Sequence, residues 1–62
     1  MLTLSEGTRV KVVDPFGKAP DRYGRVVVEI VEADFVNYLI RFDDDDSYGE
    51  VWEFYVSEAS DE

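Results

Sequence analysis

Carboxylates are the residues of this sequence that could do chemistry, and they are concentrated near its end. Residues 42 to 62 hold nine of them and no Lys or Arg, and four form the unbroken run Asp43, Asp44, Asp45 and Asp46. Residues 1 to 41 hold six acids and six bases, so the formal net charge of −9 falls in the last third of the chain. Such a surface repels nucleic-acid phosphates and attracts basic groups. It predicts docking of a basic protein or peptide segment, and no direct binding of nucleic acid.

The aspartate run does not have the spacing of a calcium site. An EF-hand loop needs a Gly at its sixth position and a bidentate Glu at its twelfth. Counting from Asp44 places Gly49 sixth but Tyr55 twelfth, and counting from Asp43 places Tyr48 sixth. We therefore predict no metal site.

Catalysis is not expected either. The chain has no His and no Cys, so a general base or nucleophile would have to be a surface carboxylate, whose pKa should stay near its ordinary value. The glycines are scattered and form no phosphate-binding loop. We predict neither an enzyme nor a bound cofactor.

Trp52 has two possible roles. If Val51 points inward, Trp52 points outward and is a candidate anchor for a partner, because Trp is enriched where binding energy is concentrated. If Trp52 points inward, it is the largest residue of the core. Glu50 and Glu53 belong to the same hairpin as the aspartate run, and we expect them to share its surface.

The composition predicts one small soluble domain. A chain of 62 residues without Cys has no disulfides and must be stabilised by apolar burial. No apolar run approaches the roughly 18 residues of a membrane span, and the N-terminus has no signal-peptide pattern. We expect a cytoplasmic protein with one domain over residues 1–62, its core at 6–58 and frayed ends at 1–5 and 59–62. The oligomeric state is not predicted.

The apolar residues recur with a period of two, which indicates β-strands. No stretch of ten residues has a helical face, and one short turn of helix is allowed near Glu53 to Tyr55. Loops are predicted where Gly, Pro and charges interrupt the pattern at Phe16 to Arg22, and where like charges repel at Asp43 to Asp46. The predicted strands are Thr8–Asp14, Arg25–Glu32, Asn37–Phe42, Tyr48–Trp52 and Val56–Glu58. The predicted core residues are Val10, Val12, Val26, Val28, Ile30, Ile40 and Val51.

Four or five short antiparallel strands in about sixty residues predict an all-β meander that closes on itself as a small barrel. Three segments resemble the strand succession of SH3-like barrels: Glu6 to Val12, Tyr23 to Val27 and Tyr38 to Asp44. The third of these resembles the Tudor group in particular. The resemblance covers roughly residues 6 to 58 and implies a small SH3-like barrel of Tudor type.

The Tudor resemblance also implies a possible ligand site. Tudor domains that read methylated Lys or Arg use a cage of aromatic rings with an acidic residue, which holds a cation through its charge and the ring faces. Matched by position, the cage residues here would be Phe42, Asp44 and Tyr48, with Tyr23 nearby. The alternative is that these aromatics form the rim of a charged hairpin.

The function that these observations predict is a non-catalytic protein-interaction module that docks a basic partner through an acidic loop and an aromatic rim. A second possibility is an acidic mimic of nucleic acid, an inhibitor of the phage or bacterial regulator type. Alternate residues of a strand lie about 6.8 Å apart, twice the rise of about 3.4 Å per phosphate along one DNA strand. The predicted partner-binding residues are Tyr23, Phe42, Asp43, Asp44, Asp45, Asp46, Tyr48, Glu50, Trp52 and Glu53.

Overall fold

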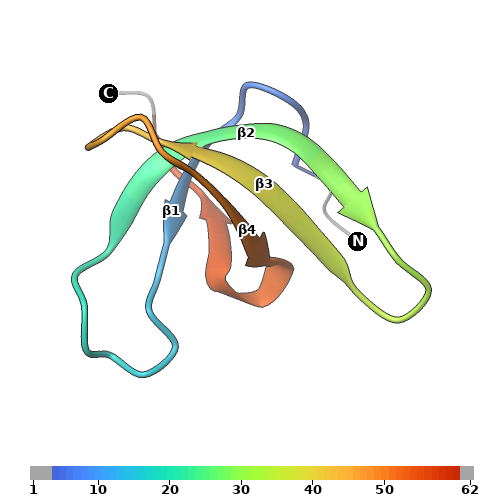
Figure 1. The fold of residues 1–62 in the computed structure, drawn as a ribbon, viewed down its shortest axis with the longest axis horizontal. Coiled ribbons are helices and arrows are strands. Elements are labelled where there is room, and N and C mark those ends of the chain that lie inside the picture. Colours follow the sequence, from blue (N-terminus) through green and yellow to red (C-terminus); the bar gives the residue numbers. More distant parts are fainter. Residues whose placement is uncertain (1–3, 61–62) are drawn as a thin grey trace.

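The computed structural model describes residues 4–60, which form five strands and one short 3₁₀ turn. The strands are short, with the exception of β2, and they follow the period-two segments of the sequence closely. Their bounds are β1 Arg9–Val12, β2 Arg22–Val31, β3 Val36–Phe42, β4 Tyr48–Trp52, the 3₁₀ turn η1 Glu53–Tyr55, and β5 Val56–Glu58 (Figure 1). The predictions of an all-β chain, and of helix limited to one turn at Glu53 to Tyr55, are confirmed for residues 4–60.

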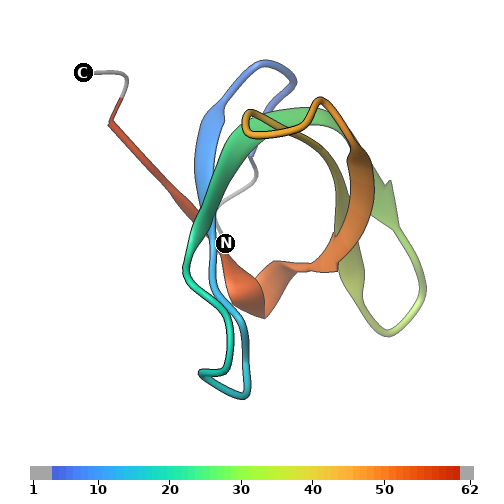
Figure 2. The ribbon, with the colours of Figure 1, turned by 60° about the vertical axis from the view of Figure 1, so that its left-hand side comes forward.

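All five strands belong to one antiparallel sheet with the order β4-β3-β2-β1-β5. The sheet is open between β4 and β5, which η1 connects, and it bends strongly around its inner side (Figure 2). The edge strands β4 and β5 have only five and three residues, which limits the exposed backbone available for unwanted pairing. Within residues 4–60, no helix has the length and apolar composition needed to cross a lipid bilayer.

The core lies on the inner side of this bend. Val10, Val26 and Ile40, which the alternation predicted, are buried there, and Val12 and Val51 pack against them. Tyr38 and Phe42 are buried beside them because they lie on the same face of β3 as Ile40. Burial of these side chains is the main source of stability for a chain that has no Cys and hence no disulfides.

The predicted core positions Val28 and Ile30 are wrong. The β2–β3 register shifts between Val26 and Val28, so that Val27 is an extra residue in β2, a β-bulge. Because side chains alternate along a strand, the bulge turns every later residue of β2 to the opposite face. Val28 is therefore 47% exposed, and Ile30, which pairs with Asn37, is only half-buried and lies outside the core.

The loop between β1 and β2 is organised by one carboxylate. Asp14 accepts hydrogen bonds from the backbone N–H groups of Phe16, Lys18 and Ala19, at 3.1, 2.8 and 2.9 Å. These bonds, led by the one from Phe16, lower the pKa of Asp14 below its usual value because they favour the ionised form. These hydrogen bonds hold the loop together, and the Asp14 carboxylate that accepts them interacts with backbone groups of its own loop.

Both ends of the described chain touch the sheet. The backbone N–H of Leu4 donates to Tyr38 Oη at 3.2 Å, and the N–H of Ala59 donates to the carbonyl of Arg9 at 2.9 Å. The predicted fraying of residues 1–3 and 61–62 lies outside the described residues.

Candidate functional site

The aspartate loop, Asp43 to Asp46, connects β3 to β4. The backbone N–H of Phe42 donates to the carbonyl of Ser47 at 2.8 Å, which closes the hairpin beneath the four aspartates. Asp46 has a φ of 57°, in the left-handed region, which Asp adopts more readily than most residues because its side chain bonds locally. The backbone N–H of Asp43 donates to the carbonyl of Tyr23 at 2.9 Å, so the loop is also attached to β2.

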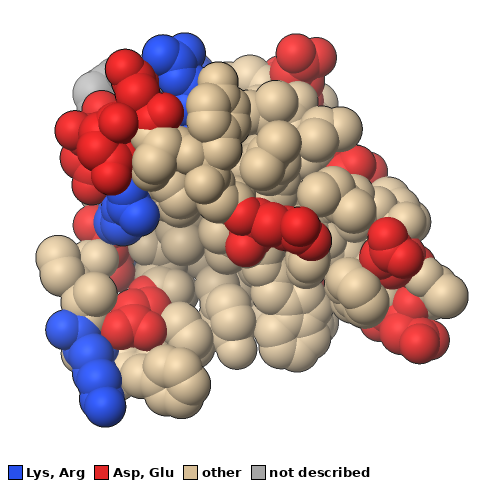
Figure 3. Space-filling view, viewed as in Figure 1, with Lys and Arg blue, Asp and Glu red and all other residues tan. Residues whose placement is uncertain are grey.

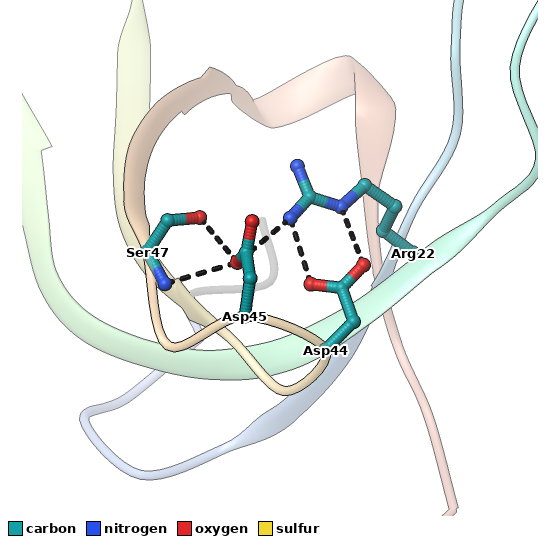
Figure 4. A network of polar contacts seen from close by, with 4 residues as sticks. All are labelled: Arg22, Asp44, Asp45 and Ser47. Carbon is teal, nitrogen blue, oxygen red and sulfur yellow. Dashed lines mark hydrogen bonds and ion pairs between the residues drawn. The ribbon is translucent and has the colours of Figure 1, made fainter.

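Arg22, the first residue of β2, makes the most contacts with this loop. Its Nε and Nη2 donate to the two carboxylate oxygens of Asp44 at 3.1 and 2.8 Å, and Nη2 also donates to Asp45 at 3.2 Å (Figure 4). The guanidinium lies over the ring of Phe42, with 3.8 Å from Cζ to the ring centroid. A bidentate ion pair stacked on an aromatic face is the geometry that Arg favours over Lys.

The two outer aspartates of the loop also have Arg partners. Asp43 lies 3.4 Å from Arg9 of β1, and Asp46 lies 2.9 Å from Arg41 of β3. Each of the four aspartates is thus paired with an Arg of the same chain. The loop that the sequence singles out as the docking surface is largely neutralised by its own protein.

These contacts favour the ionised forms of Asp45 and Arg22. Hydrogen bonds from the hydroxyl and the backbone N–H of Ser47 lower the pKa of Asp45, and Arg22 lowers it further. The hydrogen bond to Asp44 raises the pKa of Arg22 above its already high value. The contacts of Arg22 with Asp44 and Asp45 are exposed to solvent, so they should weaken as salt is added.

Replacing Arg22 by Gln is expected to loosen the aspartate loop. The change removes the contacts to Asp44, Asp45 and the Phe42 ring together, so the amide of Ser47, which donates to Asp45, should exchange faster with solvent. The urea midpoint should fall at low salt, and the difference should shrink at high salt because exposed pairs are screened. The measurements are amide hydrogen exchange and urea unfolding.

The matched control for this variant is Lys18→Gln. It removes the same charge from a residue whose side chain makes no hydrogen bond or ion pair with residues 4–60. Arg22→Lys keeps the charge but loses the bidentate geometry, and it should rescue only part of the effect. Equal behaviour of Arg22→Gln and Lys18→Gln would show that the Arg22 contacts do not hold the loop.

The structure does not bring the three cage aromatics together. Phe42 is 5% exposed and lies on the inner side, whereas Tyr48 pairs with Arg41, the residue before Phe42, and so lies on the outer face at 61% exposed. Tyr23 is also on the outer face, opposite Lys11, with the Arg9 guanidinium 5.1 Å from its ring. Phe42 is a core residue, and its ring is covered by Arg22.

The sequence left two orientations of Trp52 open, and in the structure its side chain points outward. Val51 packs against the core, and Trp52 is 42% exposed on the outer face opposite Asn37. Glu50 lies between Tyr48 and Trp52 on the same face and accepts a hydrogen bond from Asn37 Nδ2 at 2.6 Å. Trp52 also packs edge to face against Phe54 and Tyr55 of η1.

A second acidic region lies at the opposite end of the β2–β3 hairpin from the aspartate loop, and we call it the hairpin groove. It is a hollow of about 380 Å³ that contains no Lys or Arg among its lining residues. On the face shown in Figure 3, the side of the β2–β3 turn carries acidic atoms without basic ones, whereas acids and bases are mixed around the aspartate loop. The groove is lined by Glu29, Val31, Glu32, Ala33, Asp34, Phe35, Val36 and Glu53.

The groove carboxylates differ from those of the aspartate loop in their partners. The side chains of Glu32, Asp34 and Glu53 make no hydrogen bond or ion pair with any residue in the part of the chain that the structure describes. Glu29 is fixed, because Tyr38 Oη donates to its Oε2 at 3.2 Å. By contrast, a hollow of about 290 Å³ beside the aspartate loop is lined by the basic residues Arg25 and Arg41 as well as by acidic ones.

Of the groove residues, the sequence singled out Glu53 alone. The others were missed because residues 1 to 41 are balanced in charge when they are counted together, and because the bulge at Val27 decides which side of β2 carries Glu29 and Val31. The signal available in the sequence was the run from Glu29 to Asp34, which contains three acids and no base.

No group of three or more Asp or Glu side chains within residues 4–60 has the arrangement of a metal site. No protein-family model, curated protein or solved structure matches the chain.

Proposed function

We propose that the protein is a non-catalytic interaction module that docks a basic segment of a partner protein, and that its fold is a small SH3-like barrel of Tudor type. The observation that carries the function is a set of exposed carboxylates without basic partners on a protein whose net charge is −9. Within residues 4–60 the exposed ones are Glu6, Glu32, Asp34, Glu50 and Glu58, and the half-buried Glu53 also has no basic partner there.

The barrel type is supported by the order of the strands. β1 to β4 lie side by side in chain order, and β5 returns across η1 to the free side of β1. This is the order expected from the resemblance of Glu6 to Val12, Tyr23 to Val27 and Tyr38 to Asp44 to SH3-like strands. The strong bend of the sheet supports the same assignment (Figure 2).

The alternative function, mimicry of nucleic acid, draws less support from the structure. A row of carboxylates that replaces phosphates has to be free to contact a basic cleft. The longest run of acids in the chain is the aspartate loop, and its four side chains are paired with Arg9, Arg22 and Arg41. The surplus charge is instead spread over separate positions.

A basic peptide should bind this protein in a strongly salt-dependent manner. We expect capped basic peptides to shift amide signals of the ¹⁵N-labelled chain, whereas neutral and acidic peptides of equal length should not. The affinity should fall by about tenfold or more as salt rises from about 0.1 to 1 M, because the Debye length shrinks from about 10 to 3 Å. Equal binding of neutral and basic peptides, or binding that salt does not weaken, would exclude the proposed function.

A further inference from the structure

The hairpin groove combines exposed apolar surface with three carboxylates that have no partner within residues 4–60. Val31 is 66% exposed and Phe35 is 41% exposed, and both line the groove together with Glu32, Asp34 and Glu53. We propose that this groove is the docking site for a short extended segment of a partner protein that carries Lys or Arg beside an aliphatic side chain. The inference rests on the proposed function and names the surface and the partner chemistry through which it works.

The charge of the groove selects a basic partner. Four carboxylates line it, and its lining contains neither Lys nor Arg. The ion pairs of the aspartate loop already use Arg9, Arg22 and Arg41, so a partner that binds there would have to break existing contacts. A basic group that enters the groove breaks no such contact, since Glu32, Asp34 and Glu53 have no partner within residues 4–60.

The apolar part of the groove favours a partner that carries an aliphatic side chain beside its basic one. Lys and Arg have long aliphatic stems that pack along apolar surface while their charged heads stay hydrated. Val31 and Phe35 offer such surface next to the carboxylates, and the face of Phe35 adds an attraction for cations. An aliphatic side chain next to the basic one would cover the rest of this exposed apolar area. A purely polar basic segment would leave it in contact with water.

The groove is a fixed feature because the β-bulge creates it. After the bulge at Val27, Glu29 and Val31 lie on the same face as Tyr38 and Val36, with which they pair. The inner face of the hairpin thus extends beyond the core as an acidic and apolar surface. Tyr38 holds Glu29 in place through its hydroxyl, and the N–H of Glu32 donates to the carbonyl of Phe35 at 2.9 Å, which closes the turn.

The test is an NMR titration of the full ¹⁵N-labelled chain with three capped pentapeptides: Gly-Lys-Leu-Lys-Gly, Gly-Lys-Ser-Lys-Gly and Gly-Glu-Leu-Glu-Gly. The first should bind most tightly, the second about fivefold or more weakly because it lacks the apolar contact, and the third should not bind. The shifted signals should be those of residues 29 to 36 and Glu53.

Matched variants localise the effect. Glu32→Gln with Asp34→Asn should weaken binding of the first peptide by about tenfold. Glu6→Gln with Glu58→Gln removes the same charge from carboxylates that do not line the groove, so it should change the affinity for a peptide bound in the groove by about twofold or less. Val31→Thr keeps the shape of an exposed side chain, and it should bring the Leu peptide to the affinity of the Ser peptide.

The two proposals fail in different ways. If the basic peptides bind but shift the signals of residues 43 to 47 or of β1 and β5 instead, the groove is not the docking site and the interaction function stands. An equal loss of affinity in the two charge-matched double variants would also overturn the groove assignment. If none of the basic peptides binds anywhere on the chain, both proposals are wrong.

Discussion

Replacing Gly24 by Ala is expected to remove most of the protein's free energy of unfolding at room temperature. Gly24 lies in β2 directly opposite Phe42, and a Cβ at this position would collide with the backbone carbonyl of Arg41 and approach Ile40 Cγ2 to 2.9 Å. The carbonyl cannot move without breaking the β2–β3 pairing. Overpacking of this kind costs about 3 kcal/mol, and domains this small have only about 3 to 5 kcal/mol of stability.

Gly49→Ala is the matched control, because Gly49 also lies within a strand. A Cβ there would meet the edge of the Phe42 ring at 3.0 Å, and a ring edge shifts more easily than a backbone carbonyl. We expect this variant to lose about 1 kcal/mol or less. Urea unfolding followed by far-UV circular dichroism measures both, and equal midpoints for the two variants would show that the close approach at Gly24 is not a constraint.

Replacing Phe42 by Ala is expected to destabilise the protein by about 3 to 5 kcal/mol, which again approaches its whole stability. Phe42 is buried among Val10, Val26, Tyr38 and Ile40, and its ring also carries the guanidinium of Arg22. Loss of the ring would leave a cavity and would remove the stacking contact that holds the Arg22 guanidinium beside the aspartate loop. The fluorescence of Trp52, the single Trp of the chain, together with circular dichroism, reports the unfolding.

Tyr48→Ala distinguishes a core aromatic from a rim aromatic. The sequence placed Phe42 and Tyr48 together at one site, but Tyr48 is exposed on the other face of the sheet. Its replacement should change stability by about 0.5 kcal/mol or less. Phe42→Leu, which keeps most of the apolar volume, should lie between the two. If Phe42→Ala unfolds at the same urea concentration as Tyr48→Ala, the burial of Phe42 does not stabilise the fold.

The sequence predicts the strands well where apolar and polar residues alternate. The bounds of β4, η1 and β5 agree with the structure residue for residue. β2 begins at Arg22 instead of Arg25, because Arg22 to Gly24 pair with β1 although they show no apolar alternation. The bulge could not be predicted, because in a run of three Val residues nothing marks which one is extra.

The sequence predicts the excess of negative charge at the site, but it does not predict which side chains pair with one another. Counting residues gives the excess of carboxylates, but the pairing of Asp43 with Arg9 joins positions 34 apart, and that of Asp44 with Arg22 joins positions 22 apart. Such contacts depend on how the strands are arranged. For the same reason, the sequence could not show that Arg side chains pair with the most acidic segment, whereas Glu32 and Asp34 have no partner within residues 4–60.

The position of β1 between β2 and β5 has a consequence for how the protein folds. β2, β3 and β4 pair with their neighbours along the chain, whereas the segment that starts at Arg9 reaches as far as Ser60, 51 positions later. Contacts over such separations form slowly, because the entropy of closing a long loop is lost before they stabilise anything. During synthesis on the ribosome, one edge of β1 therefore stays without a partner until residues 56 to 58 emerge. In that interval the nascent chain exposes a strand edge on which aggregation can begin.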